Sequence, residues 1–87
     1  MSYYSRLRLE RAITEAERQY TDWQCKITSE ESQEYGMQDL HTFFVVIDGQ
    51  YAEDDAYDFF RDYGFHSVSE EYTAHSFAEL RIEIVGS

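Results

Sequence analysis

Apolar residues recur at helical spacing in two segments of the chain. In residues 3–20 they share one face at a spacing of about 3.6 residues, and Ser2 is placed to cap the first turn. Residues 52–63 show the same period, and Gly64 follows at the position of a left-handed C-terminal cap. The pattern therefore predicts two amphipathic helices. Their apolar positions are Leu9, Ala12, Ile13, Ala16 and Tyr20 in the first helix, and Ala52, Ala56, Phe59, Phe60 and Tyr63 in the second.

Between the helices the period changes to two. Trp23, Cys25 and Ile27 alternate with polar residues, which predicts a half-buried strand. Residues 40–48, LHTFFVVID, are apolar on both faces from Phe43 to Ile47, as is typical of a central strand. We expect two strands in this part of the chain.

After the second helix the pattern predicts two further strands. Residues 65–72 read as a weaker strand, residues 73–75 as a turn, and residues 76–85 as a strong strand. The positions of the last strand that face the core are Ala78, Leu80, Ile82 and Ile84.

The segment SEESQEYGMQD, residues 29–39, is acidic and shows no period. Eleven residues are many for a hairpin connection, so we expect a mobile loop here.

The predicted order is helix, strand, strand, helix, strand, strand, within one domain of residues 1–87. The two most apolar strands, the second and the fourth, should lie in the centre. Linking the second strand to the third by a right-handed helical crossover leaves a gap that the fourth fills, which gives an α+β fold with a four-stranded antiparallel sheet of order 1-2-4-3. Both helices then lie on one face, as in a circularly permuted ferredoxin-like sandwich. A simple meander with differently packed helices is the alternative.

This fold leaves one face of the sheet without a helix. On the second strand, either Phe44 and Val46 or Phe43, Val45 and Ile47 then lie on the open face. Because apolar patches usually mark contacts, a homodimer packed through the sheets is one expectation.

The net charge of −11 disfavours direct contact with nucleic acid or anionic membranes and favours cationic partners. The charge is uneven, since residues 27–87 carry fourteen acids and two basic groups. With one cysteine, no apolar run long enough for a membrane span and no signal peptide, the chain reads as cytoplasmic.

The strongest concentration of carboxylates lies in YAEDDAYDFFRDYG, residues 51–64. Asp54, Asp58 and Asp62 follow one another at four-residue spacing, about 6 Å apart along a helix, so they form a stripe on its exposed face. A solvated helix face is the simpler interpretation, because acidic surface runs are common and exposed ion pairs contribute little. The alternative is imitation of a polyanion by regularly spaced carboxylates on a rigid helix, with aromatic anchors beside them. The residues predicted to bind a partner are Tyr51, Glu53, Asp54, Asp55, Tyr57, Asp58 and Asp62, with Glu30, Glu31 and Glu34 of the loop.

In size, acidity and lack of a catalytic motif, the chain resembles the small acidic anti-defence proteins of bacteriophages. Anti-CRISPR proteins, anti-restriction proteins and uracil-DNA glycosylase inhibitors belong to this class. The resemblance lies in the acids of SEESQEYGMQD and YAEDDAYDFFRDYG. It implies an inhibitor, acting in the host cytoplasm, that binds a basic surface of a nuclease or another nucleic-acid-binding complex, in some members as a DNA mimic.

Catalytic and metal sites have no support in the sequence. Residues 48–58 do not match an EF-hand loop, the histidines form no close ligand pair with Cys25, and no Gly-rich phosphate loop is present. We therefore expect no enzyme activity and no cofactor. Two other functions remain open, namely a ferredoxin-like regulatory or ligand-binding module and an immunity protein or antitoxin for a basic nuclease.

Overall fold

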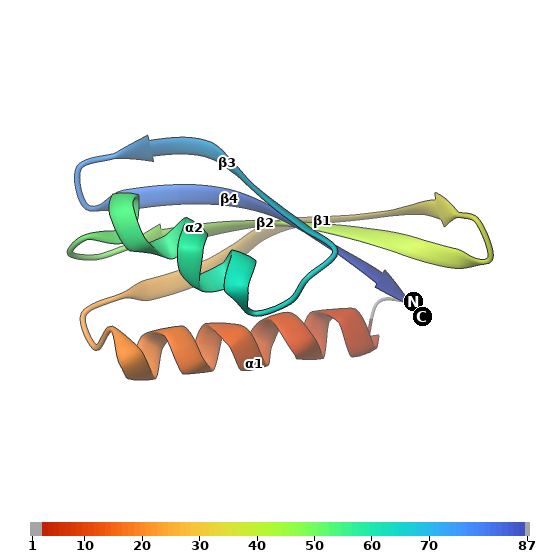
Figure 1. Ribbon diagram of the computed structural model, residues 1–87, viewed down its shortest axis with the longest axis horizontal. Coiled ribbons are helices and arrows are strands. Elements are labelled where there is room, and N and C mark those ends of the chain that lie inside the picture. Colours follow the sequence, from red (N-terminus) through yellow and green to blue (C-terminus); the bar gives the residue numbers. More distant parts are fainter. Residues whose placement is uncertain (1–2, 87) are drawn as a thin grey trace.

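A computed structural model describes residues 3–86 and has the predicted order of elements (Figure 1). The four strands form one antiparallel sheet of order β1-β2-β4-β3, which confirms the predicted α+β fold and excludes the meander. The predicted cap, Ser2, lies outside the described residues. The elements are α1 (Tyr3–Gln19), β1 (Gln24–Tyr35), β2 (Gln38–Asp48), α2 (Ala52–Asp62), β3 (Ser67–Ala74) and β4 (Phe77–Gly86).

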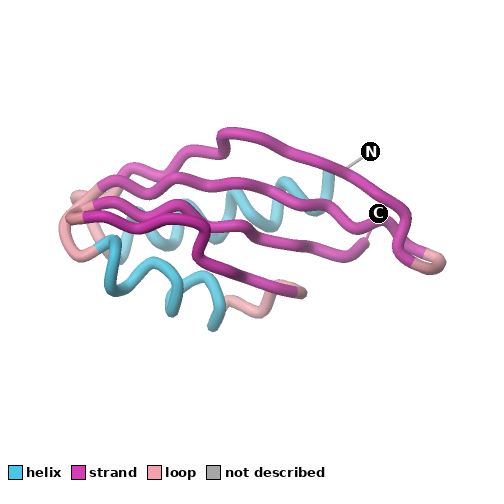
Figure 2. Tube along the Cα trace, turned by 90° about the horizontal axis from the view of Figure 1, so that it is seen from above, coloured by secondary structure: helices cyan, strands magenta, loops and turns pink. Residues whose placement is uncertain are grey.

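The core lies between one face of the sheet and both helices (Figure 2). Apolar side chains at helical spacing in α1 and α2 meet alternate residues of the two central strands, β2 and β4, as the periods of 3.6 and two require. This burial fixes the orientation of β2, because Phe43, Val45 and Ile47 are fully buried while Phe44 and Val46 face the other way. The core residues are Leu9, Ala12, Ala16, Trp23, Phe43, Val45, Ile47, Ala52, Ala56, Phe60, Ala78, Leu80, Ile82 and Ile84.

The prediction of a mobile loop at residues 29–39 was wrong. Strand β1 continues to Tyr35 and pairs with β2 up to Gln38, so that Gly36 and Met37 alone form the turn. Gly36 has φ 63 at the first turn position, where two-residue hairpins favour glycine. The hairpin end extends beyond both helices (Figure 1), and its β1 residues are exposed. Since no layer covers either side there, neither face needs apolar residues, and the alternation that marks a strand is absent.

Two hydrogen bonds join the α1–β1 connection to the β2–α2 connection. The indole Nε1 of Trp23 donates a hydrogen bond to the Gln50 carbonyl at 2.9 Å, and the Asp22 carboxylate accepts one from the Gln50 N–H at 2.7 Å. Gly49 permits this approach, because a Cβ there would lie 2.5 Å from Cδ1 of Trp23. The α1–β1 and β2–α2 connections are therefore held at one end of the molecule, next to the C-terminal end of α1.

The second helix ends as predicted, but its last apolar position does not join the core. Gly64 has φ 99, and the N–H groups of Tyr63 and Gly64 bond to the last-turn carbonyls of Phe60 and Arg61. Tyr63 was predicted on the core face, yet it lies one residue beyond α2 and is 38% exposed. Its ring packs instead between Phe59 and Phe65, at centroid distances of 6.2 and 5.4 Å.

Candidate functional site

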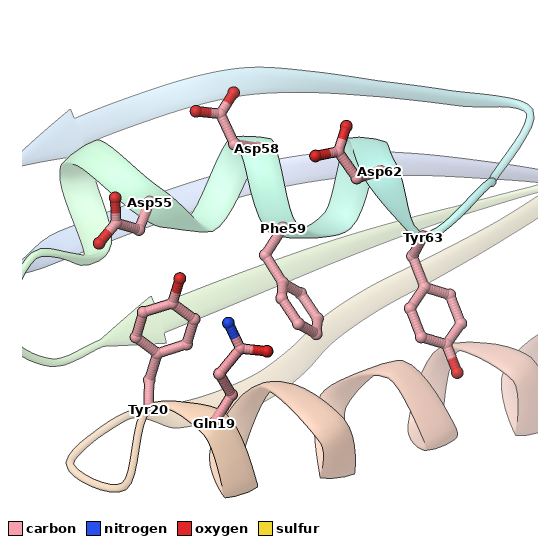
Figure 3. A pocket seen from close by; sticks show the side chains of 7 residues that line it. All are labelled: Gln19, Tyr20, Asp55, Asp58, Phe59, Asp62 and Tyr63. Carbon is pink, nitrogen blue, oxygen red and sulfur yellow. The ribbon is translucent and has the colours of Figure 1, made fainter.

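A groove lies between α2 and the C-terminal end of α1 (Figure 3). Its volume is about 310 Å³, and it combines aromatic rings with carboxylates. The first helix contributes its last residue, and Tyr20 follows it directly. The others come from α2 and from Tyr63, the residue after it. The lining residues are Gln19, Tyr20, Asp55, Asp58, Phe59, Asp62 and Tyr63.

Stacked aromatic rings form the floor of the groove. Tyr20 lies flat on Trp23, with 3.9 Å between ring centroids and 8° between planes. Phe59 meets Tyr20 edge-to-face at 6.3 Å, and Phe59 and Tyr63 both extend from α2 toward α1 (Figure 3). Because Trp23 is itself fixed by its bond to Gln50, the aromatic floor is held in place before any ligand binds.

Three aspartates line the rim on the α2 side. Asp55 lies at the end near Tyr20, whereas Asp58 and Asp62 point away from α1 along the upper edge (Figure 3). Arg61 is the nearest cation to the last two, at 3.5 Å from Asp58 and 3.4 Å from Asp62. Within residues 3–86 no ion pair to Asp55 is found, so three carboxylates share one guanidinium and the rim keeps a negative charge.

The acids that line the groove differ from those of the predicted stripe. Asp58 and Asp62 belong to both, but Asp55 lines the groove where the stripe had Asp54. Asp54 is exposed outside the groove. Asp55 lies four residues before Phe59, whose ring extends toward α1 (Figure 3), so position 55 is on the groove side of α2 and position 54 is not.

The two predicted aromatic anchors do not line the groove. Tyr57 is half-buried, with the Arg61 guanidinium 5.4 Å from its ring centroid. Tyr51 is 59% exposed at the N-cap of α2, in a left-handed conformation with φ 65. The rings that do line it, Tyr20 and Phe59, were assigned to the core by their helical spacing. Helical spacing does not distinguish a side chain in the core from one in a groove at the border of the core. The nearby aspartates were the only sign in the sequence that these rings line a site.

The acids of the hairpin do not line the groove either. Glu30 pairs with Arg6 of α1 at 3.0 Å. Glu31 lines a small cavity of about 70 Å³ beside Thr42 and Arg81, and Glu34 is exposed near the turn. The hairpin end projects away from the C-terminal end of α1 (Figure 1), so these carboxylates form a separate acidic region.

Glu53 has a structural contact that the sequence did not indicate. Its Oε2 accepts a hydrogen bond from the Ser76 N–H at 3.0 Å and lies 3.4 Å from Nδ1 of His75. These contacts tie the first turn of α2 to the β3–β4 turn. The Ser76 N–H, together with the N–H of Glu53 itself, holds the pKa of this carboxyl below its ordinary value of 4.5.

This contact makes the stability of the fold depend on pH in acid. Since the pKa is lower in the folded state, ionised Glu53 stabilises the fold above pH 4.5, and this contribution is lost as the pH falls through the lower folded value. Glu53→Gln is expected to be less stable than the wild type near neutral pH, with a difference that shrinks in acid. Urea unfolding of both proteins between about pH 3 and 7 tests this, and a constant difference would contradict it.

Cys25 is a poor nucleophile in this environment. Burial, and then the Glu17 carboxylate, raise the pKa of its thiol from 9.0 to about 12. The same carboxylate accepts a hydrogen bond from the Cys25 N–H at 2.9 Å. The thiol faces the core side of β1 with Ile27, as predicted from the alternation.

Cys25 is therefore expected to react slowly with thiol reagents in the folded protein. A pKa about three units higher lowers the thiolate fraction by about 1,000-fold, so we expect labelling near pH 8 at least about 100-fold slower than in urea. Equal rates in the folded and unfolded states would show that the thiol is not protected.

A metal site and a membrane-spanning helix are both absent from the described part of the chain. Within residues 3–86 no three His, Cys, Asp or Glu side chains are grouped so that they could hold a metal ion. In the same range no helix is long and apolar enough to cross a membrane.

Comparisons with family models, with curated proteins and with solved structures found no match for this chain. The groove and the distribution of charge are therefore the features that bear on function.

Proposed function

We propose that this protein is a small non-enzymatic inhibitor that binds a basic surface of another protein through the acidic groove. The observation that carries the proposal is the combination of a fixed aromatic floor with three aspartates that share one arginine. A cationic side chain gains from both parts, because carboxylates attract its charge and ring faces attract it through their quadrupole.

The target surface is one that normally binds nucleic acid. Asp55, Asp58 and Asp62 are separated by about 4.5 and 6 Å along the axis of α2, the same order as the roughly 3.4 Å of axis per phosphate in a DNA strand. A groove that binds phosphates with Arg and Lys can therefore accept this helix. Together with the small size and the charge of −11, this favours the anti-defence class of phage proteins, acting in the host cytoplasm.

An immunity protein or antitoxin for a basic nuclease would use the same surface and differs in its target. A regulatory ligand-binding module is less supported, because its ligand would have to be cationic to match this rim.

Capture of the partner tests the proposal. The immobilised protein is expected to retain one predominantly basic, nucleic-acid-binding protein from a bacterial lysate, identified by mass spectrometry and released by salt. Reversal of the helix acids, Asp54→Lys with Asp58→Lys and Asp62→Lys, should abolish retention and leave the fold intact, since none of the three is in the core.

A matched control variant separates the effect of the groove on binding from the effect of net charge. Asp39→Lys with Glu70→Lys and Glu71→Lys makes the same change in charge at exposed positions outside the groove. This control should retain the partner. Full retention by the helix variant would mean that the carboxylates of α2 are only a solvated face.

A further inference from the structure

Strand β1 forms one edge of the sheet, and the two halves of this edge differ. In the first half, the Cys25 N–H donates a hydrogen bond to the Glu17 carboxylate of α1 at 2.9 Å. This half ends at a bulge, where the pairing with β2 shifts between Ile27 and Ser29. Beyond the bulge, residues 29–35 pair with β2 in unbroken register up to the turn. We call residues 29–35 the distal edge.

The distal edge presents backbone groups to which β2 cannot bond. Tyr35 and Gln38 lie on either side of the two-residue turn, where the paired residues bond to each other through their backbones. Such pairs alternate along an antiparallel ladder with pairs whose backbone groups point outward. The N–H and C=O groups of residues 30, 32 and 34 therefore point away from β2. Within residues 3–86, no hydrogen bond to these outward groups is found.

The side chain of Ser32 supports this alternation. Its Oγ lies 2.8 Å from Nδ1 of His41, its partner across the ladder. Side chains come closest in pairs without backbone hydrogen bonds, as an outward position at Ser32 requires. His41 is fully buried and lies on the same side of β2 as Phe43, the side on which the helices pack. Because side chains alternate along a strand, Glu30, Ser32 and Glu34 share this side of the sheet.

The distal edge carries negative charge that nearby arginines do not neutralise. Residues 27–40 contain no Lys or Arg. Arg6 of α1 pairs with Glu30 at 3.0 Å, and Arg81 of β4 pairs with Glu83 at 3.0 Å. Three further carboxylates at this end of the sheet form no ion pair within residues 3–86, namely Glu31, Glu34 and Asp39.

The distal edge also lacks most of the features that prevent a further strand from adding to a sheet. Lysine, proline and bulges usually serve this purpose on edge strands. The opposite edge, β3, has a bulge between Glu70 and Tyr72 that leaves no more than four residues in register on either side. The distal edge has seven residues in register and only its glutamates. These repel a second copy of the same edge, because like charges opposite one another destabilise a strand pair, but they do not repel a basic strand.

We propose that the distal edge binds an extended basic segment of another protein, which adds antiparallel to β1 as a fifth strand. Backbone groups of the segment bond to the outward groups of residues 30, 32 and 34, as in other complexes formed by strand addition. Residues of the segment directly opposite these positions have their side chains on the same side of the sheet, next to Glu30 and Glu34. The segment therefore has Lys or Arg at every second position.

This site is separate from the groove. The groove lies at the C-terminal end of α1, whereas the distal edge belongs to the hairpin end that projects away from it (Figure 1). The segment at the distal edge is distinct from the surface that the groove contacts. The proposal therefore does not rest on the proposed function, and either can fail without the other.

Titration with a synthetic peptide tests strand addition. The probe is a peptide of about nine residues in which Lys alternates with Thr, added to the isotopically labelled full chain. We expect saturable amide NMR shifts at residues 29–35. We also expect slower hydrogen exchange at the N–H groups of residues 30, 32 and 34, because these groups become bonded.

Two methylated peptides of the same charge separate backbone pairing from charge attraction. Methylation of the backbone nitrogen at each Lys removes the N–H groups that face β1, so binding should weaken at least about tenfold. Methylation at each Thr changes nitrogens that point away from β1, so this peptide should bind within about threefold of the probe. Equal binding of the probe and the Lys-methylated peptide would show attraction by charge alone and would overturn the proposal.

A change in the edge itself provides a second test. Glu34→Pro removes one outward N–H without loss of a bond to β2, since edge strands accept proline at such positions. Glu34→Gln makes the same change in charge and retains the N–H. The proline variant should bind the probe at least about tenfold more weakly than the glutamine variant, and circular dichroism verifies that both are folded. Equal binding by the two folded variants would contradict strand addition.

The position of the shifts in the wild-type protein decides between surfaces, whether or not a variant folds. Shifts confined to residues 55–63 would place the peptide in the groove, and shifts confined to residues 67–74 would place it on β3. Either result, or no saturable shift at about 1 mM peptide, would overturn the proposal for the distal edge.

Discussion

Replacement of Phe60 by alanine is expected to lower the free energy of unfolding by about 3 to 5 kcal/mol. Phe60 is one of the two largest fully buried side chains, and it anchors α2 against the sheet. A domain of 87 residues has a total stability on the order of 4 to 13 kcal/mol, so this change removes a large part of it.

Urea unfolding followed by circular dichroism measures this loss. Met37→Ala provides the control, because Met37 is 102% exposed in the hairpin turn and its truncation should change stability by less than about 0.5 kcal/mol. A loss below about 1 kcal/mol for Phe60→Ala would mean that α2 is not packed as described. The groove would then lack its rigid wall.

Neutralising the rim of the groove is expected to weaken partner binding at least about 100-fold. The variant combines Asp55→Asn, Asp58→Asn and Asp62→Asn, which keep the shape of the side chains and remove their charge. Close charge pairs at protein interfaces couple by about 1.5 to 7 kcal/mol, so loss of two such pairs alone costs about 3 kcal/mol, close to 100-fold in affinity. Isothermal titration calorimetry with the captured partner at physiological salt measures the change in the dissociation constant.

The control for this variant changes the same amount of charge elsewhere. The control variant combines Asp39→Asn, Glu70→Gln and Glu71→Gln, which are all outside the groove. It should reduce the rate of association with the partner by only a few fold. An equal loss of affinity in both variants would indicate that net charge, and not the groove, determines binding.

The sequence predicted those parts of the fold in which a core imposes a period. Ala52, Ala56 and Phe60 identified the buried face of α2, and the apolar runs of β2 and β4 placed these strands in the centre of the sheet. The extension of β1 to Tyr35 could not be read in the same way, because the hairpin end has no layer on either side. Its polar residues are compatible with a strand and with a loop.

The candidate site was predicted in composition but not in geometry. The sequence identified Asp58 and Asp62 and the acidic first turn of α2, but the choice between Asp54 and Asp55 depends on how the helix is rotated against α1. The role of Tyr20 depends on its stacking on Trp23, a contact set by the fastened connections at that end of the molecule. Such contacts between neighbouring elements leave no periodic signal.

The central claim is that the groove between α1 and α2 contacts the basic partner. The most direct test is the mapping of backbone amide NMR shifts while the captured partner is added to isotopically labelled protein. We expect the largest shifts or broadening at residues 19–20 and 55–63, with little change in the hairpin end at residues 29–39. The largest changes in the hairpin end or on the sheet face opposite the helices, with residues 55–63 unaffected, would contradict the account.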